Sequence, residues 1–488
     1  MNGALPMPGS RSAPWLIALA LASVLVARMG LIPRHVHDIG FSEMNVVDGV
    51  ARILQGLPLY GDPEQPPYDI MQYAPLHYLV CAGAAKLLGI DAHNAQALYM
   101  VSRWAALLAN MAMCILLWRT AQRLGLSSWG RWLLPGLMFT WMHEPYFSRP
   151  DSIYLLCCTG LIGTALHLSA SEGLGWRGAW RLGTWSALTL FSKQSGVGVV
   201  AAVGVAFLLN DGWRAAWRYG LAAFTVNAAA LAALVTADGW HNVYANLVLG
   251  NVNGWAFPWF IIDPREPYNG MGLWITPVAI LLAHRLRRTH RRMAIFLLAS
   301  MVVTYLWAFA IVGKQGANMN YFMEHWQLCA LACLVFIDRA GHVRVRPVLA
   351  FALTAMVLVR GAWFTWVFAL SGYPPDDAAK YRDDVQALRT LEAHGMAPGD
   401  ALFVVDRHSF VDQLAGSRSW LKQKDIIRLS GAALLLDHSA MFDNTRNGAL
   451  RYVLTTDSTA VLGHKYRAFD GWVRTFAAGR YHVYERAR

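Results

Sequence analysis

Charged side chains are scarce in this sequence. Only 15% of its 488 residues are Asp, Glu, Lys or Arg, whereas 56% are hydrophobic and the mean hydropathy is +0.33. This composition excludes an ordinary soluble globular protein of the same length and indicates a membrane protein. The formal net charge of +12 would suggest a nucleic-acid partner in a soluble protein, but in a membrane protein the position of each charge matters more than the sum. We therefore expect no nucleic-acid partner.

Cysteine is also scarce, and its positions exclude a disulfide framework. All six cysteines fall in apolar segments, and none lies in the regions expected outside the membrane. Cys329 and Cys333 share one helix face, but two thiols without a further ligand are packing residues rather than a metal site. The short cluster of His35, His37 and Asp38 leaves a divalent metal open as a minor alternative. Otherwise the sequence predicts no metal and no cofactor.

Long apolar runs, by contrast, occur along most of the first 370 residues. With spans of about 17 to 24 residues, the sequence predicts eleven transmembrane helices. They lie near residues 15–33, 97–118, 132–147, 152–170, 182–193, 195–210, 219–237, 271–283, 293–313, 322–337 and 347–370. The first run could pass for a signal peptide, but only Arg11 precedes it and no small-residue cleavage site follows. We therefore expect it to be retained as a helix.

The basic residues predict the orientation of these helices. Every second loop is rich in Lys and Arg, which indicates that these loops face the cytoplasm. The basic loops contain Arg119, Arg123 and Arg131; Arg177 and Arg181; Arg214 and Arg218; the stretch HRLRRTHRR at 284–292; and Arg339, Arg344 and Arg346. With eleven spans, the N-terminus is cytoplasmic and the C-terminal part is extracytoplasmic. We interpret the membrane as a bacterial inner membrane.

Two long segments are expected on the outer face. Segment 34–96 contains a predicted amphipathic helix from Ser42 to Leu54 on the membrane interface, a proline-rich turn region and a short apolar helix. Segment 371–488 has an ordinary globular composition and predicts one helix and three strands. These elements are expected at 376–395, 401–406, 451–457 and 480–486. The fold class is thus mainly α: a polytopic membrane domain over residues 1–370, with a small extracytoplasmic α/β domain over the rest.

Three isolated cations lie on the short loops of the outer face. Lys193 interrupts an apolar run from about Leu182 to Leu209, where a charge costs on the order of 2.5 to 3.5 kcal/mol. Arg149 in SRPD and Lys314 in GKQGANMNYF lie on loops of the same face. In one interpretation Lys193 snorkels to lipid headgroups. In the other, which the proximity of Arg149 and Lys314 favours, the three cations form one site.

Two carboxylates, Asp38 and Glu43, follow the first helix on that face. A base beside several cations suits group transfer from a phosphate-bearing lipid. The carboxylate takes a proton from an acceptor hydroxyl, while the cations neutralise the departing phosphate. Because a phosphate leaves without protonation, one carboxylate is enough. For Glu43 an equally open alternative is an ordinary acid at a helix N-terminus, which the helix dipole favours.

Several short motifs occur in a fixed order along the chain. An acidic residue in the first outer loop is followed by ARILxGxxLY, YAPLHY, RPD, SKQS and GxxxNYFxE. With these motifs the sequence resembles the GT-C superfamily of polytopic glycosyltransferases over most of residues 14–370. It is most similar to bacterial relatives of the protein mannosyltransferases and aminoarabinose transferases. The resemblance implies inverting transfer of a sugar from a polyprenyl-phosphate donor to a hydroxyl acceptor. The sugar is left open, and so is the acceptor: a glycan, a lipid or a protein.

The resemblance also implies roles for particular residues. Glu43 or Asp38 holds the place of the catalytic carboxylate, and both remain candidates because the common adjacent Asp-Glu pair is absent. The other expected site residues are the donor-phosphate cations Arg149, Lys193, Lys314 and Arg103, the orienting residue Asp151, and Asn320 and Tyr321 of the sugar or lipid pocket.

Two other functional classes stay open. A lipid-linked glycan flippase or transporter would also bury charges, but such proteins often show repeated halves, and the sequence contains no such internal repeat. An O-antigen ligase or polymerase would use a pyrophosphate carrier. It would also favour arginine-rich outer loops over this first-loop acid pattern.

Overall fold

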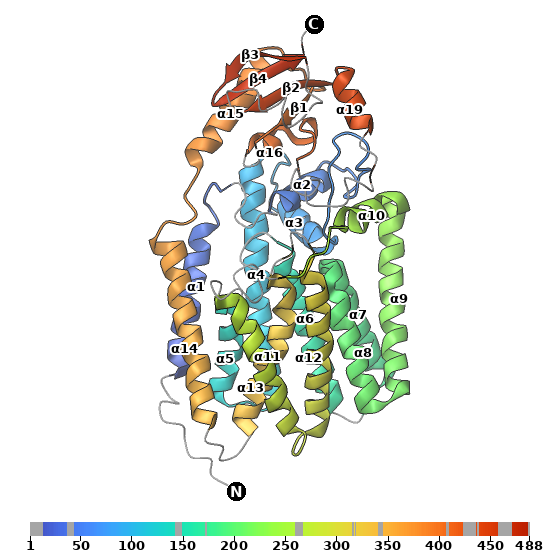
Figure 1. Ribbon diagram of the computed structural model, residues 1–488, viewed down its shortest axis with the longest axis vertical. Helices are drawn as coiled ribbons and strands as arrows, with labels where there is room; N and C mark the ends of the chain where they lie inside the picture. Colours follow the sequence, from blue (N-terminus) through green and yellow to red (C-terminus); the bar gives the residue numbers. More distant parts are fainter. Residues whose placement is uncertain are drawn as a thin grey trace.

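The computed structural model shows a bundle of helices that carries a small sheet domain at one end (Figure 1). Helix α1 (Ala13–Leu31) begins at the other end of the bundle. The structure describes residues 13–36, 43–141, 149–170, 173–258, 267–314, 317, 319–339, 345–406, 409–422, 436, 439–456 and 471–486.

Each of the eleven predicted spans overlaps a helix of the bundle. These helices are α1 (Ala13–Leu31), α4 (Ala95–Arg123), α5 (Ser128–Trp141), α6 (Asp151–Ala170), α7 (Trp176–Ser192), α8 (Val197–Asp211), α9 (Trp213–Asp238), α11 (Pro267–Leu286), α12 (Arg291–Val312), α13 (Met323–Arg339) and α14 (Val345–Thr365). Among the described residues, seven segments are long and apolar enough to cross a membrane; they comprise α1, α4, α6, α9, α12, and α8 and α14 with their adjoining turns. The number of crossings and their direction stay predictions.

Local sequence signals set the ends of several helices. Asn94 caps α4, because its side-chain oxygen accepts a hydrogen bond from the backbone N–H of Ala97 at 3.1 Å. Gly212 separates α8 from α9, and its φ of +78° is a conformation that glycine adopts without strain. Gly183 of α7 lets α9 approach closely, because a Cβ there would lie 2.8 Å from the backbone of Ala222.

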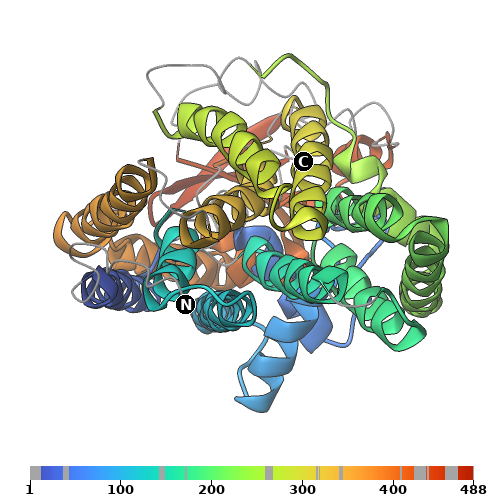
Figure 2. The same ribbon diagram turned by 90° about the horizontal axis from the view of Figure 1, so that it is seen from below.

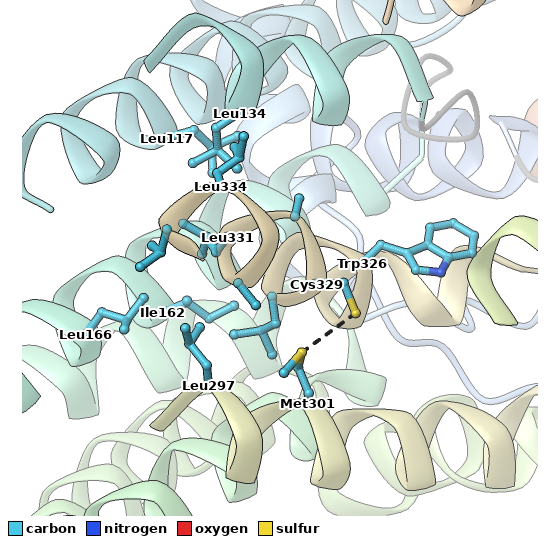
Figure 3. Close-up of a cluster of buried hydrophobic side chains, with 14 of the residues drawn as sticks. Leu117, Leu134, Ile162, Leu166, Leu297, Met301, Trp326, Cys329, Leu331 and Leu334 are labelled. Atoms are coloured by element: carbon cyan, nitrogen blue, oxygen red, sulfur yellow. Dashed lines mark hydrogen bonds between the residues drawn. The ribbon is translucent and has the colours of Figure 1, made fainter. Parts of the chain in front are cut away.

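Helix α13 lies near the middle of the bundle, whereas α9 lies at one edge and the pair α1 and α14 at the other (Figure 2). Every residue from Met323 to Ile337 is buried, as expected for a helix surrounded by other helices. Leu331 and Leu334 of α13 point toward side chains of α4, α5 and α6 (Figure 3). Cys329 faces α12, where its Sγ lies 3.8 Å from Sδ of Met301.

The first outer segment forms α2 (Glu43–Leu54) and α3 (Leu76–Leu87). Helix α2 lies where the sequence predicts it, but all residues from Glu43 to Val50 are buried. Helices α3, α4 and α16 (Val411–Ala415) contact α2, so it is enclosed by protein instead of lying on the membrane interface. The hydrophobic pattern of an interfacial helix is the same as that of a helix covered by a second domain, which is why the sequence did not distinguish them.

The C-terminal part contains α15 (Ala378–Ala393) and a four-stranded sheet. The strands are β1 (Ala401–Val404), β2 (Leu450–Thr455), β3 (Trp472–Ala478) and β4 (Tyr481–Arg486), in the order β1-β2-β4-β3. Strands β1 and β2 are parallel, and the other two neighbouring pairs are antiparallel. Helix α15 and strands β1, β2 and β4 match the prediction, whereas β3 was missed. The remaining described helices are α10 (Trp240–Leu247) and α19 (Ser439–Arg446).

A buried charge cluster joins this domain to the first outer segment. The Nζ atom of Lys422 lies 3.1 Å from Oδ2 of Asp69 and 3.5 Å from Oδ1 of Asp48, and at most 5% of each residue is exposed. The backbone N–H of Lys422 also donates to Asp69 at 3.0 Å. Next to this cluster, the ring of Tyr68 packs edge-on against Trp420. The outer segment and the C-terminal domain therefore share one buried interface.

Burial raises the pKa of Asp48 from 3.8 to about 7, although Lys422 opposes the shift. The folded protein then binds a proton at Asp48 more tightly than the unfolded chain does. This contribution to stability is present at low pH and is lost as the pH rises from about 4 to about 7.

We expect Asp48→Asn, which resembles the protonated acid, to reduce this fall in stability, as measured by thermal unfolding in detergent from pH 4 to pH 8. The exposed Asp383→Asn is the control, and an unchanged slope in Asp48→Asn would contradict the prediction.

Candidate polar site at the sheet-domain end of the bundle

Asp151 is the centre of a buried polar cluster. It is the first residue of α6, where the helix dipole favours a negative charge. Its Oδ1 accepts hydrogen bonds from Nζ of Lys193 at 2.6 Å and from Nδ2 of Asn320 at 3.1 Å, and Nε of Arg149 lies 3.1 Å from Oδ2. Asp151, Lys193 and Asn320 are almost completely buried. One carboxylate therefore holds two cations in place.

Lys193 lies at a break between two helices. Its backbone is extended (φ −158°, ψ 131°), so α7 ends at Ser192 and a short turn leads into α8. The Nζ atom lies 4.4 Å from the ring centre of Tyr321 and 5.8 Å from that of Tyr154, close enough for cation–π attraction. Only 4% of Lys193 is exposed, so it does not snorkel to headgroups but is held within the protein.

Lys314 follows the end of α12 and approaches the same cluster. Burial and the nearby positive charge of Lys193 lower the pKa of Lys314 from 10.5 to about 8. Its Nζ lies 3.4 Å from Oδ1 of Asn251, which is a weak contact that leaves N–H donors available. Arg149, Lys193 and Lys314 thus lie in one electrostatic neighbourhood, as the sidedness of their loops suggests.

The first outer segment contacts this cluster through polar side chains and one carbonyl. The carbonyl oxygen of Gln72 accepts hydrogen bonds from Gln194 and Asn251, both at 2.8 Å. His77 of α3 is fully buried and lies within electrostatic range of Asp151. The first outer segment therefore forms one wall of the cluster.

Several buried polar atoms at this place have no hydrogen-bond partner among the described residues. They are Nδ1 of His77, Oδ1 of Asn320 and Oε2 of Glu324. Buried polar atoms are nearly always paired, so unpaired atoms near charged groups indicate a place for a polar ligand or for water. Sequence reasoning gave no role to His77 or Glu324, although both belong to the motifs YAPLHY and NYFxE.

Glu43 and Arg103 form a separate buried pair. Nε and Nη2 of Arg103 donate to the two carboxylate oxygens of Glu43 at 3.1 and 2.8 Å. The remaining N–H donors of Arg103 are directed at backbone carbonyls of residues 32, 34 and 36. In this conformation all five N–H donors are engaged, which weighs against the prediction that Arg103 binds a donor phosphate.

Along α4, the Glu43–Arg103 pair lies closer to the N-terminal end of the helix than the Asp151 cluster does. Asn110 of α4 donates to Ser152, the neighbour of Asp151, at 3.1 Å. Arg103 precedes Asn110 by seven residues, which corresponds to about 10 Å along a helix. Glu43 is therefore on the same end of the bundle as the cations, about two helical turns along α4 from the Asp151 cluster.

Asp38 as a catalytic carboxylate and a metal at His35, His37 and Asp38 stay predictions. Asp38 and His37 lie outside the described residues, and the imidazole of His35 lies 3.4 Å from a carboxylate oxygen of Asp376. The described residues include one further group of possible metal ligands on the outer segments. One ligand atom from each of Asp62, Glu64 and His241 lies within 4.8 Å of the others. The sequence does not predict this group, because His241 is far from the two acids along the chain and the three residues form no metal-binding motif.

Solved structures with the same architecture are known. ArnT from Cupriavidus metallidurans bound to undecaprenyl phosphate superimposes with a TM-score of 0.60 at 11% identity, covering 96% of this chain and 97% of that one. Archaeal oligosaccharyltransferase AglB from Archaeoglobus fulgidus, in complex with an inhibitory peptide and a dolichol-phosphate, gives 0.55 at 12% identity and covers 98% and 74%. Arabinofuranosyltransferase AftD from Mycobacteria gives 0.57 at 14% identity and covers 97% and 40%.

The chain therefore has the GT-C fold, and it is a multi-pass membrane protein with a small C-terminal sheet domain. The predicted fold class is confirmed, whereas the number of membrane crossings and the side of the membrane on which the C-terminal domain lies stay predictions. No protein-family model matches the sequence, and no curated protein sequence matches it. At identities of 11% to 14%, these likenesses concern the fold alone.

The Glu43–Arg103 pair yields a test of the role of Glu43. Glu43→Gln should lower the free energy of unfolding by about 3 to 5 kcal/mol, because it leaves Arg103 buried without its counter-charge. Glu43→Gln/Arg103→Gln should recover part of this loss. Unfolding in detergent measures stability, and a sugar-transfer assay on the folded double variant measures activity. An active double variant would exclude Glu43 as the base, and a fully stable single variant would contradict the structural role.

Proposed function

We propose that this protein is a glycosyltransferase that moves a sugar from a polyprenyl-phosphate donor to a hydroxyl acceptor on the outer face of a bacterial inner membrane. The observation that carries the proposal is the convergence of Arg149 and Lys193 on Asp151, with Lys314 within electrostatic range of Lys193, at the end of the bundle that carries the C-terminal domain. Two proteins of the same fold were solved with undecaprenyl phosphate and with dolichol-phosphate. The acceptor is a glycan, a lipid or a protein.

The cations suit a phosphate leaving group. In the reaction an acceptor hydroxyl oxygen attacks the anomeric carbon, the bond from that carbon to the phosphate oxygen breaks, and polyprenyl phosphate departs with the electron pair. A single displacement of this kind inverts the anomeric configuration. Arg149 and Lys193 are fixed before the substrate binds, because both contact Asp151. Charges that need no reorganisation stabilise the developing phosphate charge most effectively.

The acceptor proton requires a carboxylate base. Asp38 and Glu43 are the candidates that follow the first helix. Both oxygens of Glu43 accept hydrogen bonds from one guanidinium, so an acceptor hydroxyl would have to compete with Arg103 for them. Glu324 is a third candidate, because it lies within electrostatic range of Lys193 and Asp151, and its Oε2 has no partner among the described residues. Of the three, we favour Asp38.

The lipid tail of the donor needs an apolar surface beside the site. Helix α3, which carries His77, exposes Leu79, Leu87 and Leu88 by 52%, 90% and 69%. Large exposed apolar side chains next to a polar site suit contact with lipid chains. We place the entry of the donor next to this helix.

The function is tested by incubating the purified protein with radiolabelled polyprenyl-phosphate sugars and with a membrane glycan and lipid extract. Transfer of label to a new product supports the proposal. Movement of the intact donor across a vesicle membrane without transfer would indicate a flippase, and transfer only from pyrophosphate-linked donors would indicate a ligase or polymerase. Either of the latter results would overturn the proposal.

Lys314 offers a separate test of phosphate binding. Removal of one charged donor in Lys314→Ala should raise the KM for the donor about ten- to a hundredfold and leave kcat less affected. The exposed Arg389→Ala on α15, which also removes one positive charge but lies outside the cluster and outside α3, is the control. Because Lys314 loses its charge as the pH rises through about 8, the KM of the unmodified protein should rise over the same range. Lys314→Arg, which stays charged, should remove that rise; if the rise persists, Lys314 does not bind the phosphate.

A further inference from the structure

The end of the bundle opposite to the C-terminal domain holds a second charged site. The connection between α11 and α12 lies at this end (Figure 1). A cavity of about 730 Å³ is formed there by the last turn of α11, the connection, the start of α12 and the end of α13. Its charged lining includes Arg285, Arg287, Arg288 and Arg291.

These four guanidinium groups have no carboxylate partner among the described residues. The carboxylates nearest in the fold are engaged elsewhere: Asp211 pairs with Arg292, and Asp338 accepts hydrogen bonds from Ser127 at 2.8 Å. Arg339, which also lines the cavity, donates to the carbonyl of Leu124. Four like charges around one cavity repel each other, so an anion there would stabilise the folded state.

The start of α12 adds a second feature that attracts anions. His290 precedes the helix and makes no side-chain capping bond to it. The first backbone N–H groups of a helix have no partner within the helix, and together with the helix dipole they favour a bound anion. Helix α12 has 22 residues, so this dipole is fully developed.

The same cavity has apolar walls. Leu281 of α11 lines it and is 54% exposed, whereas Phe336 of α13 also borders it but is almost completely buried. A soluble anion would gain nothing from Leu281, whereas the chains of a lipid would pack against it. The cavity therefore combines cationic and apolar walls, as the headgroup region of a lipid requires.

We propose that this cavity is a binding site for an anionic membrane lipid that carries two phosphate groups. A guanidinium group can bind one phosphate through two parallel N–H···O hydrogen bonds. Four arginines can therefore hold two phosphates, with two guanidinium groups at each. Basic pockets between membrane helices are known to bind such headgroups. The site is separate from the Asp151 cluster, and the proposal does not depend on the transfer reaction.

The test is native mass spectrometry of the full chain in neutral detergent, titrated with cardiolipin, phosphatidylglycerol or phosphatidylcholine. We expect one cardiolipin to bind saturably, phosphatidylglycerol to bind more weakly, and phosphatidylcholine not to compete. Arg287→Gln/Arg288→Gln should weaken cardiolipin about thirtyfold. Arg287→Lys/Arg288→Lys, which keeps the charge that orients the protein in the membrane, should weaken it less but measurably, because lysine cannot bind in a bidentate manner.

Arg177→Gln/Arg181→Gln is the matched control, because it removes two exposed arginines from the first turns of α7, and neither lines the cavity. An equal loss of cardiolipin in this control, or no loss in the Arg287/Arg288 variants, would overturn the proposal. Inorganic pyrophosphate is titrated in parallel. If pyrophosphate binds and cardiolipin does not displace it, the cavity takes a soluble anion and the assignment of a lipid is wrong. Unfolding midpoints of all variants confirm that they are folded.

Discussion

The structure of the end of the bundle that carries the C-terminal domain depends on the pairing of Asp151 with Lys193. Isolated charges at this depth would be costly, and each becomes tolerable only because the other is beside it. Their contact brings the start of α6 to the end of α7, and Asn320 adds the turn before α13. Since Arg149 contacts the same carboxylate, the pairing concentrates more positive than negative charge at one place. An excess of fixed positive charge is what an anionic lipid headgroup requires.

The helices of the bundle could be predicted from the sequence, because a long apolar run reports directly on a helix in a membrane. The common location of Arg149, Lys193 and Lys314 could be inferred as well, since it follows from which loops share a side. The sequence could not, however, predict which carboxylate pairs with which cation. Asp151 lies forty-two residues from Lys193 and Glu43 lies sixty from Arg103, and no spacing rule pairs residues across such distances.

The predictions for α2 and β3 were wrong because the surroundings of each segment cannot be inferred from its own residues. Helix α2 has the pattern of an interfacial helix, but its apolar face is covered by protein, and a hydrophobic pattern does not identify what covers it. Strand β3 was missed because WVRTFAA has only a weak alternation, and its residues are mostly exposed or half-buried in the structure. It belongs to the sheet because the long pairing with β4 holds it there.

Helix α2 connects the helix bundle to the C-terminal part, because it carries a buried carboxylate for each of these two neighbours. Glu43 at its start is bound by Arg103 of α4, and Asp48 one turn later contacts Lys422 of the C-terminal part. Removal of Arg103 or of Lys422 would leave buried carboxylates without a counter-charge, which costs several kcal/mol. A displacement of the C-terminal domain would therefore also move α2. The segment that follows α2 would move with it, and the carbonyl of Gln72 in this segment accepts hydrogen bonds from two side chains beside the cations. The small domain is thus part of the structure that positions the site.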